Sequence, residues 1–126
     1  MTKIIFYKTN GVFYGFEEQG HTGYGESGDD ILCSALSAMT MLIINAIEVS
    51  YASDVEYTID DATADIRLIA KGARAEYEDD ESKRFAVSGL IMAYYYQLID
   101  LVEEYYDYLD VEVVEKKFDG NKKRKI

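Results

Sequence analysis

One histidine and one cysteine are present in the chain, His21 and Cys33, and eleven residues separate them. A thiol with an imidazole beside it is the pair that nucleophilic cysteine catalysis requires, because the imidazole accepts the thiol proton and later protonates the leaving group. The stretch between them is rich in glycine, and the stretch after Cys33 has a helical pattern. The sequence therefore predicts a Cys–His dyad, and we expect any chemistry of this chain to lie here.

Cys33 is expected near the start of a helix that begins between Ser27 and Asp30. This places the thiol within or just beyond the first turn, where backbone N–H groups have no helical partner and the helix dipole is positive. Both effects favour a thiolate, and the same N–H groups are suitable donors to an oxyanion.

The side of the helix on which Cys33 lies also bears on its role. If Leu32 marks the centre of the apolar face, Cys33 points about 100° away from it, in line with Ser37, Thr40 and Ile44. A cysteine that only fills the core is expected on the apolar face itself. The pattern therefore favours a thiol on the flank of the helix beside small polar groups, although a lone cysteine can also be an inert, buried one.

Four glycines surround the histidine, namely Gly20, Gly23, Gly25 and Gly28. Glycine lets the backbone bend freely and lets a substrate chain come close. We therefore expect a loop in which His21 acts as the general base, with Gly20 and Gly25 orienting the loop or contacting substrate.

Two carboxylates precede the cysteine, Asp29 and Asp30, and two roles are open to them. The commoner role of an aspartate here is to cap the helix, and the other is to orient the His21 imidazole as a third catalytic member. A carboxylate that points at the thiol would disfavour the thiolate. Asp30, together with Ser37 one turn after Cys33, is a candidate for orienting the site.

The elements that must position this pair follow from the hydrophobic pattern. Asn10-Gly11 between two β-branched and aromatic runs is a strong hairpin signal, and alternating or helical patterns mark the other elements. The predicted elements are strands 3–9 and 12–16, a helix 29–52, a second hairpin 54–60 and 64–70, an acidic connection 71–82, a helix 83–109 capped by Ser82, and a strand 111–118. We expect an α+β domain of order ββαββαβ, with two helices on one face of a mainly antiparallel sheet of about five strands.

The apolar faces of both helices are expected to form the core. The first is predicted to consist of Leu32, Ala35, Leu36, Met39, Leu42, Ile43, Ala46 and Ile47, and the second of Phe85, Leu90, Ile91, Tyr94, Leu98, Leu101, Val102, Tyr105 and Tyr106. The consecutive tyrosines Tyr94, Tyr95 and Tyr96 span about 200° of the second helix, which is more than a sheet-facing side can bury. We expect the remaining apolar surface to form a homodimer interface.

Length and charge limit the organisation and the partners. The 126 residues predict one domain over 1–118, followed by a basic tail 119–126 that we expect to be disordered. The net charge of -11 argues against direct binding of nucleic acid, which needs a basic face. It suits a basic protein substrate or partner, and it equally suits a protein that is acidic for solubility alone.

Composition also bears on metals and on the compartment. One cysteine excludes an internal disulfide and suits a reducing cytoplasm, and one histidine with one cysteine is too few for a structural zinc site. The N-terminus lacks the apolar region of a signal peptide, and no uninterrupted apolar run approaches the roughly 20 residues of a membrane span. We expect a cytoplasmic protein with no metal, no cofactor and no membrane segment.

The motif around the dyad resembles that of a bacterial family, the ribosomal-processing cysteine proteases, called Prp, of Firmicutes and related bacteria. The family pattern is Gly-His, a short glycine-containing loop, then Gly-x-Asp, two aliphatic residues, Cys, a small residue, two variable residues and Ser. Here it reads Gly20-His21, Gly25, Gly28, Asp30-Ile31-Leu32-Cys33-Ser34 and Ser37. The N-terminal hairpin, the chain length and the ββα order are similar too, so the resemblance covers nearly the whole chain.

The resemblance implies a specific activity. Members of this family remove a short N-terminal extension from ribosomal protein twenty-seven of the large subunit, with the cysteine as nucleophile and the histidine as its partner, and these roles fall on Cys33 and His21. The resemblance also implies a homodimer whose substrate is a ribosomal-protein precursor. Phage-encoded relatives process capsid or scaffold proteins, so a related structural precursor is the other expected substrate.

Two readings without catalysis stay open at this point. The chain would then be a binding module that binds a protein during ribosome assembly, or a protein whose Cys33 thiol senses oxidation. The second alternative lacks a second cysteine to resolve an oxidised Cys33. Rapid alkylation of Cys33 near neutral pH would favour the enzyme, because a buried and inert thiol reacts slowly.

Overall fold

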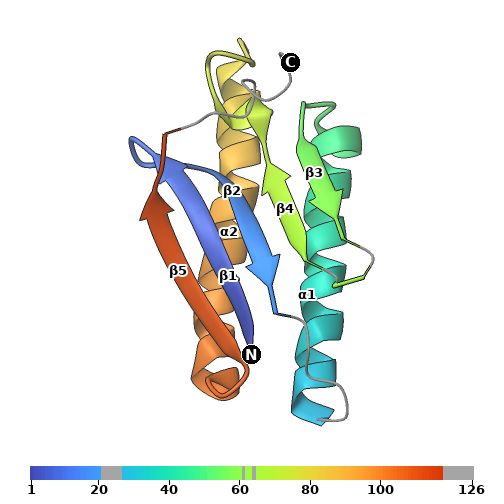
Figure 1. The fold of residues 1–126 in the computed structure, drawn as a ribbon. Coiled ribbons are helices and arrows are strands. Elements are labelled where there is room, and N and C mark those ends of the chain that lie inside the picture. Colours follow the sequence, from blue (N-terminus) through green and yellow to red (C-terminus); the bar gives the residue numbers. More distant parts are fainter. Residues whose placement is uncertain (21–26, 61, 64, 118–126) are drawn as a thin grey trace.

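Two β-hairpins and a final strand make up one sheet, and both long helices cover the same face of it (Figure 1). This architecture comes from a computed structural model, which describes residues 1–20, 27–60, 62–63 and 65–117 and, for residues 27–30, the backbone alone. The order of the long elements is the predicted ββαββαβ. The predicted α+β class is confirmed.

The first hairpin joins β1 (Thr2–Thr9) to β2 (Val12–Gln19). Asn10 and Gly11 form its turn with φ angles of 50° and 79°, and two left-handed residues are what a tight type I′ hairpin turn requires. The predicted hairpin is confirmed, but β2 is longer than predicted and continues beyond position 16 to Gln19. The longer strand brings the chain closer to the predicted histidine loop before it leaves the sheet.

The sheet has the order β3-β4-β2-β1-β5, where β3 is Glu56–Ile59, β4 is Ile66–Ile69 and β5 is Leu109–Glu115. The central strand β2 pairs antiparallel with β1 and with β4, while β5 runs parallel to β1 at the edge. It follows that β4 and β5 run in the same direction, and the long helix between them supplies the crossover that this requires. The predicted mainly antiparallel sheet is confirmed.

The two long helices are α1 (Ser27–Asn45) and α2 (Glu81–Tyr105). The predicted first helix of 29–52 is divided, because Ala46–Ser50 forms a wider, π-helical turn after α1. The buried side chains are Leu32, Leu36, Thr40, Ile43, Ile44 and Ile47 on the first helical segment, and Val87, Ile91, Tyr94 and Leu98 on α2.

Part of each predicted apolar face lies outside the core. Leu42 of α1 is 65% exposed, and Phe85 of α2 is 72% exposed. Thr40 and Ile44, which were not on the predicted face, are each 1% exposed. These predictions are wrong because a periodic pattern gives the helical repeat but not which side of the helix the sheet covers.

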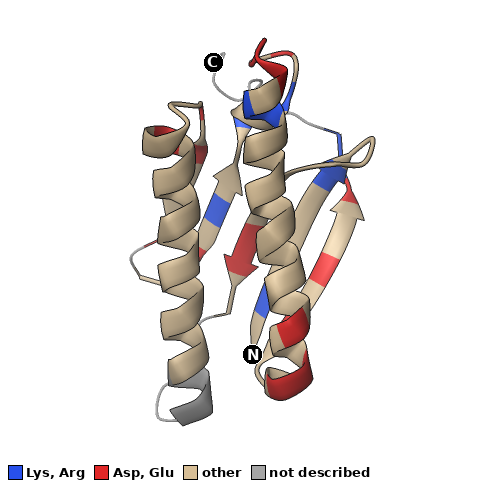
Figure 2. Ribbon diagram, turned by 180° about the vertical axis from the view of Figure 1, so that it is seen from behind, with Lys and Arg blue, Asp and Glu red and all other residues tan. Residues whose placement is uncertain are grey.

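Both helices are long and apolar enough, by length and composition alone, to cross a membrane. The segments are Ile31–Ser50 and Glu81–Tyr105. In this structure each segment contributes side chains to the core that the helices share with the sheet. Figure 2 shows their outer sides, on which charged residues gather near the helix ends.

A carboxylate just before α2 caps that helix. Asp80 Oδ1 accepts hydrogen bonds from the backbone N–H of Ser82 at 2.9 Å and of Lys83 at 3.4 Å. Two amides that have no helical partner are thereby satisfied. Ser82, the predicted cap, lies inside the first turn, so that prediction is wrong. Both residue types are good caps, and the local sequence does not decide between them.

Asp80→Ala is expected to lower the free energy of unfolding by about 1 kcal/mol, because the two amides lose their acceptor. Ser82→Ala is expected to change it by less than about 0.5 kcal/mol. Urea denaturation measures both, and Asp79→Ala, at the neighbouring exposed carboxylate, controls for the loss of one negative charge. Equal losses in Asp79→Ala and Asp80→Ala would show that charge, and not capping, acts at this position.

Candidate active site

Cys33 is the seventh residue of α1 and lies in its second turn. The helix begins at Ser27, within the predicted range of start positions. The Cys33 side chain is half-buried, whereas Leu32 and Leu36 are 1% and 0% exposed. The thiol therefore lies at the margin of the core, where one side of it is accessible to a substrate.

This position bears on how the thiol could be activated. Amides without a helical partner belong to the first turn, and the effect of the helix dipole falls off within that turn. Cys33 is just beyond the first turn, as the sequence predicted. The prediction that the amides of the helix start support a thiolate or an oxyanion stays a prediction, and an imidazole partner is the other expected source of activation.

The side of α1 that carries Cys33 leads into the core. Thr40, seven residues further on and two turns along the same side, is 1% exposed, and so is Ile44 after it. Ser37, which lies between Cys33 and Thr40, is exposed. Cys33 is thus half-buried at the start of a helix side whose later residues, Thr40 and Ile44, are buried.

Gly20 follows β2 and directly precedes His21, and the backbone at this point requires glycine. Its φ is +84°, and a Cβ atom on it would lie 2.4 Å from the Met1 carbonyl oxygen. Its N–H donates to Asp65 Oδ1 at 3.3 Å. Gly20, the last described residue before His21, therefore lies close to the Met1 carbonyl group on one side and is hydrogen-bonded on the other to Asp65, the residue directly before β4.

The structure does not cover every predicted site residue. His21 and Gly25 lie outside the described residues, and Asp30 is described by its helical backbone alone. Of the others, Cys33 and Ser37 share one side of α1, and Gly20 lies at the end of β2 from which the chain runs on to α1 (Figure 1). The pairing of His21 with Cys33, and the choice for Asp30 between a cap and a third catalytic member, stay predictions.

A buried carboxyl group near this site was not singled out from the sequence. Glu18 of β2 is 0% exposed. Its Oε1 accepts a hydrogen bond from Thr40 Oγ1 of α1 at 3.0 Å and another from the Tyr94 hydroxyl of α2, and the two hydroxyl oxygens are 3.3 Å apart. The sequence signal was the run of three polar residues that ends β2, since strand alternation turns one of them towards the helices.

The strands on both sides of Glu18 place an apolar residue next to it. Burial raises the pKa of Glu18 to about 7, and the hydrogen bonds from Tyr94 and then Thr40 oppose this rise. Ile4 of β1 and Ile66 of β4 are its cross-strand neighbours. Burial, followed by the nearby carboxylate, also raises the pKa of Tyr94, so its hydroxyl stays protonated and donates.

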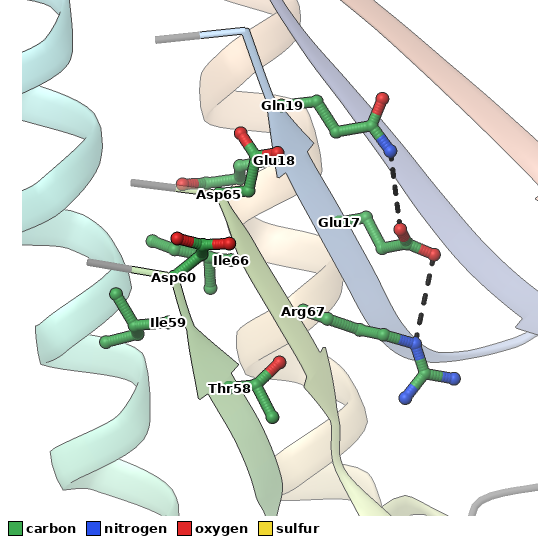
Figure 3. A pocket seen from close by; sticks show the side chains of 9 residues that line it. All are labelled: Glu17, Glu18, Gln19, Thr58, Ile59, Asp60, Asp65, Ile66 and Arg67. Carbon is green, nitrogen blue, oxygen red and sulfur yellow. Dashed lines mark hydrogen bonds and ion pairs between the residues drawn. The ribbon is translucent and has the colours of Figure 1, made fainter. Parts of the chain in front are cut away.

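A shallow hollow of about 370 Å³ opens at the end of β2 (Figure 3). Its lining residues are Glu17, Glu18, Gln19, Thr58, Ile59, Asp60, Asp65, Ile66 and Arg67. Arg67 Nε lies 3.9 Å from Glu17 Oε2, and Asp65 also binds the Gly20 amide. Because carboxyl groups outnumber the single guanidinium, this hollow is acidic, and it adjoins the residue that leads to His21.

The structure is a small α+β domain that carries its half-buried thiol on the first helix after an N-terminal hairpin. A family model described as "Cysteine protease Prp" matches residues 1–110. The chain belongs to this family of cysteine proteases, so the family resemblance of the dyad motif is confirmed. A comparison with curated protein sequences finds no match.

Several solved structures have a fold similar to that of this chain. SMU.848 from Streptococcus mutans has a TM-score of 0.75 at 26% sequence identity, and the match covers 92% of this chain and 96% of that one. An essential ribosomal processing protease Prp from S. aureus, in complex with a substrate peptide, has a TM-score of 0.74 at 17% identity, covering 90% of this chain and 100% of that one. The S. aureus protease with a covalently linked product peptide has a TM-score of 0.69 at 18% identity, with the same coverage of 90% and 100%.

The free energy of unfolding is expected to depend on the protonation of Glu18. The native state holds this proton up to about pH 7, whereas a glutamate of ordinary pKa loses it near 4.5, so deprotonation favours unfolding as the pH rises through this window. Glu18→Gln keeps an acceptor oxygen but cannot ionise. Between about pH 5 and about pH 8, the wild-type protein should lose on the order of 1–3 kcal/mol relative to Glu18→Gln in urea denaturation.

A matched variant separates this effect from the loss of any one charge. Glu104→Gln removes a carboxylate from the exposed side of α2 and should keep the pH dependence of the wild-type protein. If Glu18→Gln also keeps it, the buried carboxyl is not the titrating group.

Proposed function

We propose that this protein is an endopeptidase of ribosomal-protein maturation in which Cys33 is the nucleophile and His21 its general base. The observation that carries the proposal is the half-buried thiol on α1 of a chain that matches the cysteine protease Prp family. The substrate is a basic ribosomal-protein precursor, cut within an N-terminal extension such as that of ribosomal protein twenty-seven of the large subunit. A reducing cytoplasm, which keeps Cys33 as a thiol, is the compartment that suits it.

The reaction balances with the protein's own groups and one water molecule. Cys33 Sγ passes its proton to His21 and attacks the scissile carbonyl carbon, so that a C–S bond forms and the carbonyl oxygen becomes negative. His21 then protonates the leaving amine, the C–N bond breaks, and a thioester remains. Water, deprotonated by His21, attacks this thioester and releases the carboxylic acid product and the Cys33 thiol.

Electrostatics supports a basic substrate. The net charge of -11 attracts a cationic chain and speeds its encounter with the protein. The acidic hollow at the end of β2 adjoins Gly20 through Asp65, so a peptide that reaches His21 would pass close to its carboxyl groups. A basic structural precursor from another source, such as a phage scaffold protein, would meet the same field.

The deciding experiment incubates the protein with a peptide that spans the N-terminal extension of the ribosomal precursor and follows the products by mass spectrometry. Cys33→Ala and Cys33→Ser are expected to abolish cleavage without unfolding the domain, because the side chain lies at the margin of the core. Retained cleavage by Cys33→Ala would rule out the cysteine mechanism. Tight binding without cleavage by the wild-type protein would instead identify a binding module.

His21→Ala in the same assay is expected to lower kcat by roughly 10²–10⁴, which is the usual contribution of a general base. Asp30→Asn should cost less activity than His21→Ala if Asp30 caps α1. An effect of His21→Ala on KM alone would make His21 a binding residue and place the base elsewhere.

We further propose a homodimer joined through the helical layer. No Asp, Glu, Lys or Arg occurs in residues 31–47 or in residues 85–99, and these uncharged stretches form the middle of both helices on the side turned away from the sheet (Figure 2). Leu42 and Tyr96 are 65% and 59% exposed there. Between the helices lies a hollow of about 220 Å³ that is lined by Met39, Leu42, Ile43, Leu90, Ala93, Tyr94 and Gln97.

The exposed residues differ from those that the sequence suggested. Tyr94 is buried, and the Tyr95 ring packs against Phe6 and Phe13 with centroid distances of 5.3 and 5.4 Å, which leaves Tyr96 as the exposed one of the three. In a chain of net charge -11, an uncharged face is where two copies approach with the least repulsion. A twofold axis would cover the same patch on both copies.

Analytical ultracentrifugation at micromolar concentration tests the dimer. The expected mass is near twice 14.4 kDa, and Leu42→Glu should shift it to the monomer because it buries a charge in the interface. Val114→Glu, at a partly exposed apolar residue of β5, is the control that should leave the dimer intact. A wild-type species at the mass of one chain would contradict the proposal.

A further inference from the structure

Three elements around the site each contribute a buried polar side chain to one point. Among the described side chains, Glu18 is the buried carboxyl of β2, Thr40 the buried polar residue of α1, and Tyr94 the residue that brings a buried hydroxyl from α2. Each of the three is within hydrogen-bond distance of the other two. We call Glu18, Thr40 and Tyr94 the Glu18 cluster. The helices could cover the sheet without it, because apolar side chains would pack there without the cost of removing a carboxyl group from water.

The Glu18 cluster constrains α1 in a way that apolar packing does not. A hydrogen bond is directional, and losing one partner leaves a buried polar group without compensation. A slip of α1 by one residue combines a shift of about 1.5 Å along its axis with a turn of about 100°, and the turn would carry Thr40 away from the Glu18 carboxyl. The cluster therefore fixes the height and rotation of α1 against β2 and α2.

Two of the three elements in the cluster lead to the proposed reacting groups. Cys33 lies on the same side of α1 as Thr40, about 10 Å back along the helix axis. His21 follows Glu18 by three residues along the chain. Because β2 runs towards the end of the molecule at which α1 begins (Figure 1), the direction from Thr40 to Cys33 is also the direction in which β2 runs. A shift of α1 at the cluster would displace Cys33 by the same amount relative to β2, the strand that precedes His21 in the chain.

We propose that Glu18, Thr40 and Tyr94 are positioning residues for the reaction at Cys33, which hold α1, and with it the thiol, at one height against β2. This inference rests on the proposed Cys33–His21 dyad and adds what fixes the position of its nucleophile. A misplacement of about 1 Å in a reacting pair lowers the rate about a hundredfold. Loss of one hydroxyl in the cluster should therefore act on kcat and much less on KM.

The test uses variants that change one hydroxyl without changing the shape of the side chain. Thr40→Val and Tyr94→Phe remove a donor, and Thr40→Ser retains it. One readout is kcat and KM for cleavage of the ribosomal precursor peptide. The other is the rate of Cys33 alkylation by iodoacetamide as a function of pH, which needs no substrate.

Thr40→Val and Tyr94→Phe are each expected to lower kcat by about 10- to 100-fold, with KM changed by less than about twofold. Both should also move the midpoint of the alkylation profile to higher pH, because the thiol is less well paired with its base. Thr40→Ser should restore both readouts towards the wild-type values.

Ile47→Val controls for stability, because it removes one buried methylene group from the segment after α1 and leaves the hydrogen-bonding groups of the cluster unchanged. It should lower the melting temperature and leave kcat and the alkylation profile unchanged. If Thr40→Val behaves as Ile47→Val does at a similar melting temperature, the cluster is merely structural and the inference is wrong. If the wild-type protein cuts no ribosomal peptide but Thr40→Val still shifts the alkylation profile, the proposed substrate is wrong and the positioning role stands.

Discussion

The carboxyl group of Glu18 lies on the central strand, between the sheet and both helices, where it has no contact with bulk water. Removing a carboxyl group from water is costly unless hydrogen bonds replace those lost, and Thr40 and Tyr94 supply them from the two helices. Most other side chains between the helices and the sheet are aliphatic or aromatic, and the hydrophobic effect that buries them is not directional. The Glu18 carboxyl therefore adds a directional contact that ties α1, and the thiol that it carries, to the central strand and to α2.

Local features of the structure could be predicted from the sequence. The Asn10-Gly11 turn, the two long helices and the placement of Cys33 near a helix start depend on residues that are neighbours in the chain, and their chemistry is legible in a short window. The family resemblance is of the same kind, since its motif is contained in one stretch between Gly20 and Ser37. That stretch also explains why the class of chemistry could be named before the fold.

Features that depend on distant residues could not be predicted in this way. Glu18, Thr40 and Tyr94 are far apart in the chain, and each by itself resembles an ordinary strand, flank or core residue. The helical pattern predicts Thr40 on a polar flank, but Thr40 is buried because its hydroxyl is hydrogen-bonded to Glu18. The pattern of one helix does not show such a partner on another element. The helical pattern predicts Phe85 in the core because it does not show which side of α2 the sheet covers. Errors of this kind fall where tertiary contacts override a local preference.

The site combines a thiol at the margin of the core, a glycine directly after β2 and an acidic hollow at the end of β2. In the proposed enzyme each part serves a different need. The core margin keeps the nucleophile accessible yet anchored, Gly20 permits the backbone conformation of the residue before His21, and the acidic hollow suits a cationic substrate. The account rests on covalent chemistry at Cys33, with His21 as the proposed base.

The covalent intermediate is the most direct test of that account. The wild-type protein is mixed with the precursor peptide, quenched in acid during turnover, digested and measured by mass spectrometry. The account predicts that the peptide containing Cys33 gains the mass of the N-terminal cleavage product less one water, as a thioester requires. Cleavage that continues at the normal rate after Cys33 has been fully alkylated would contradict it.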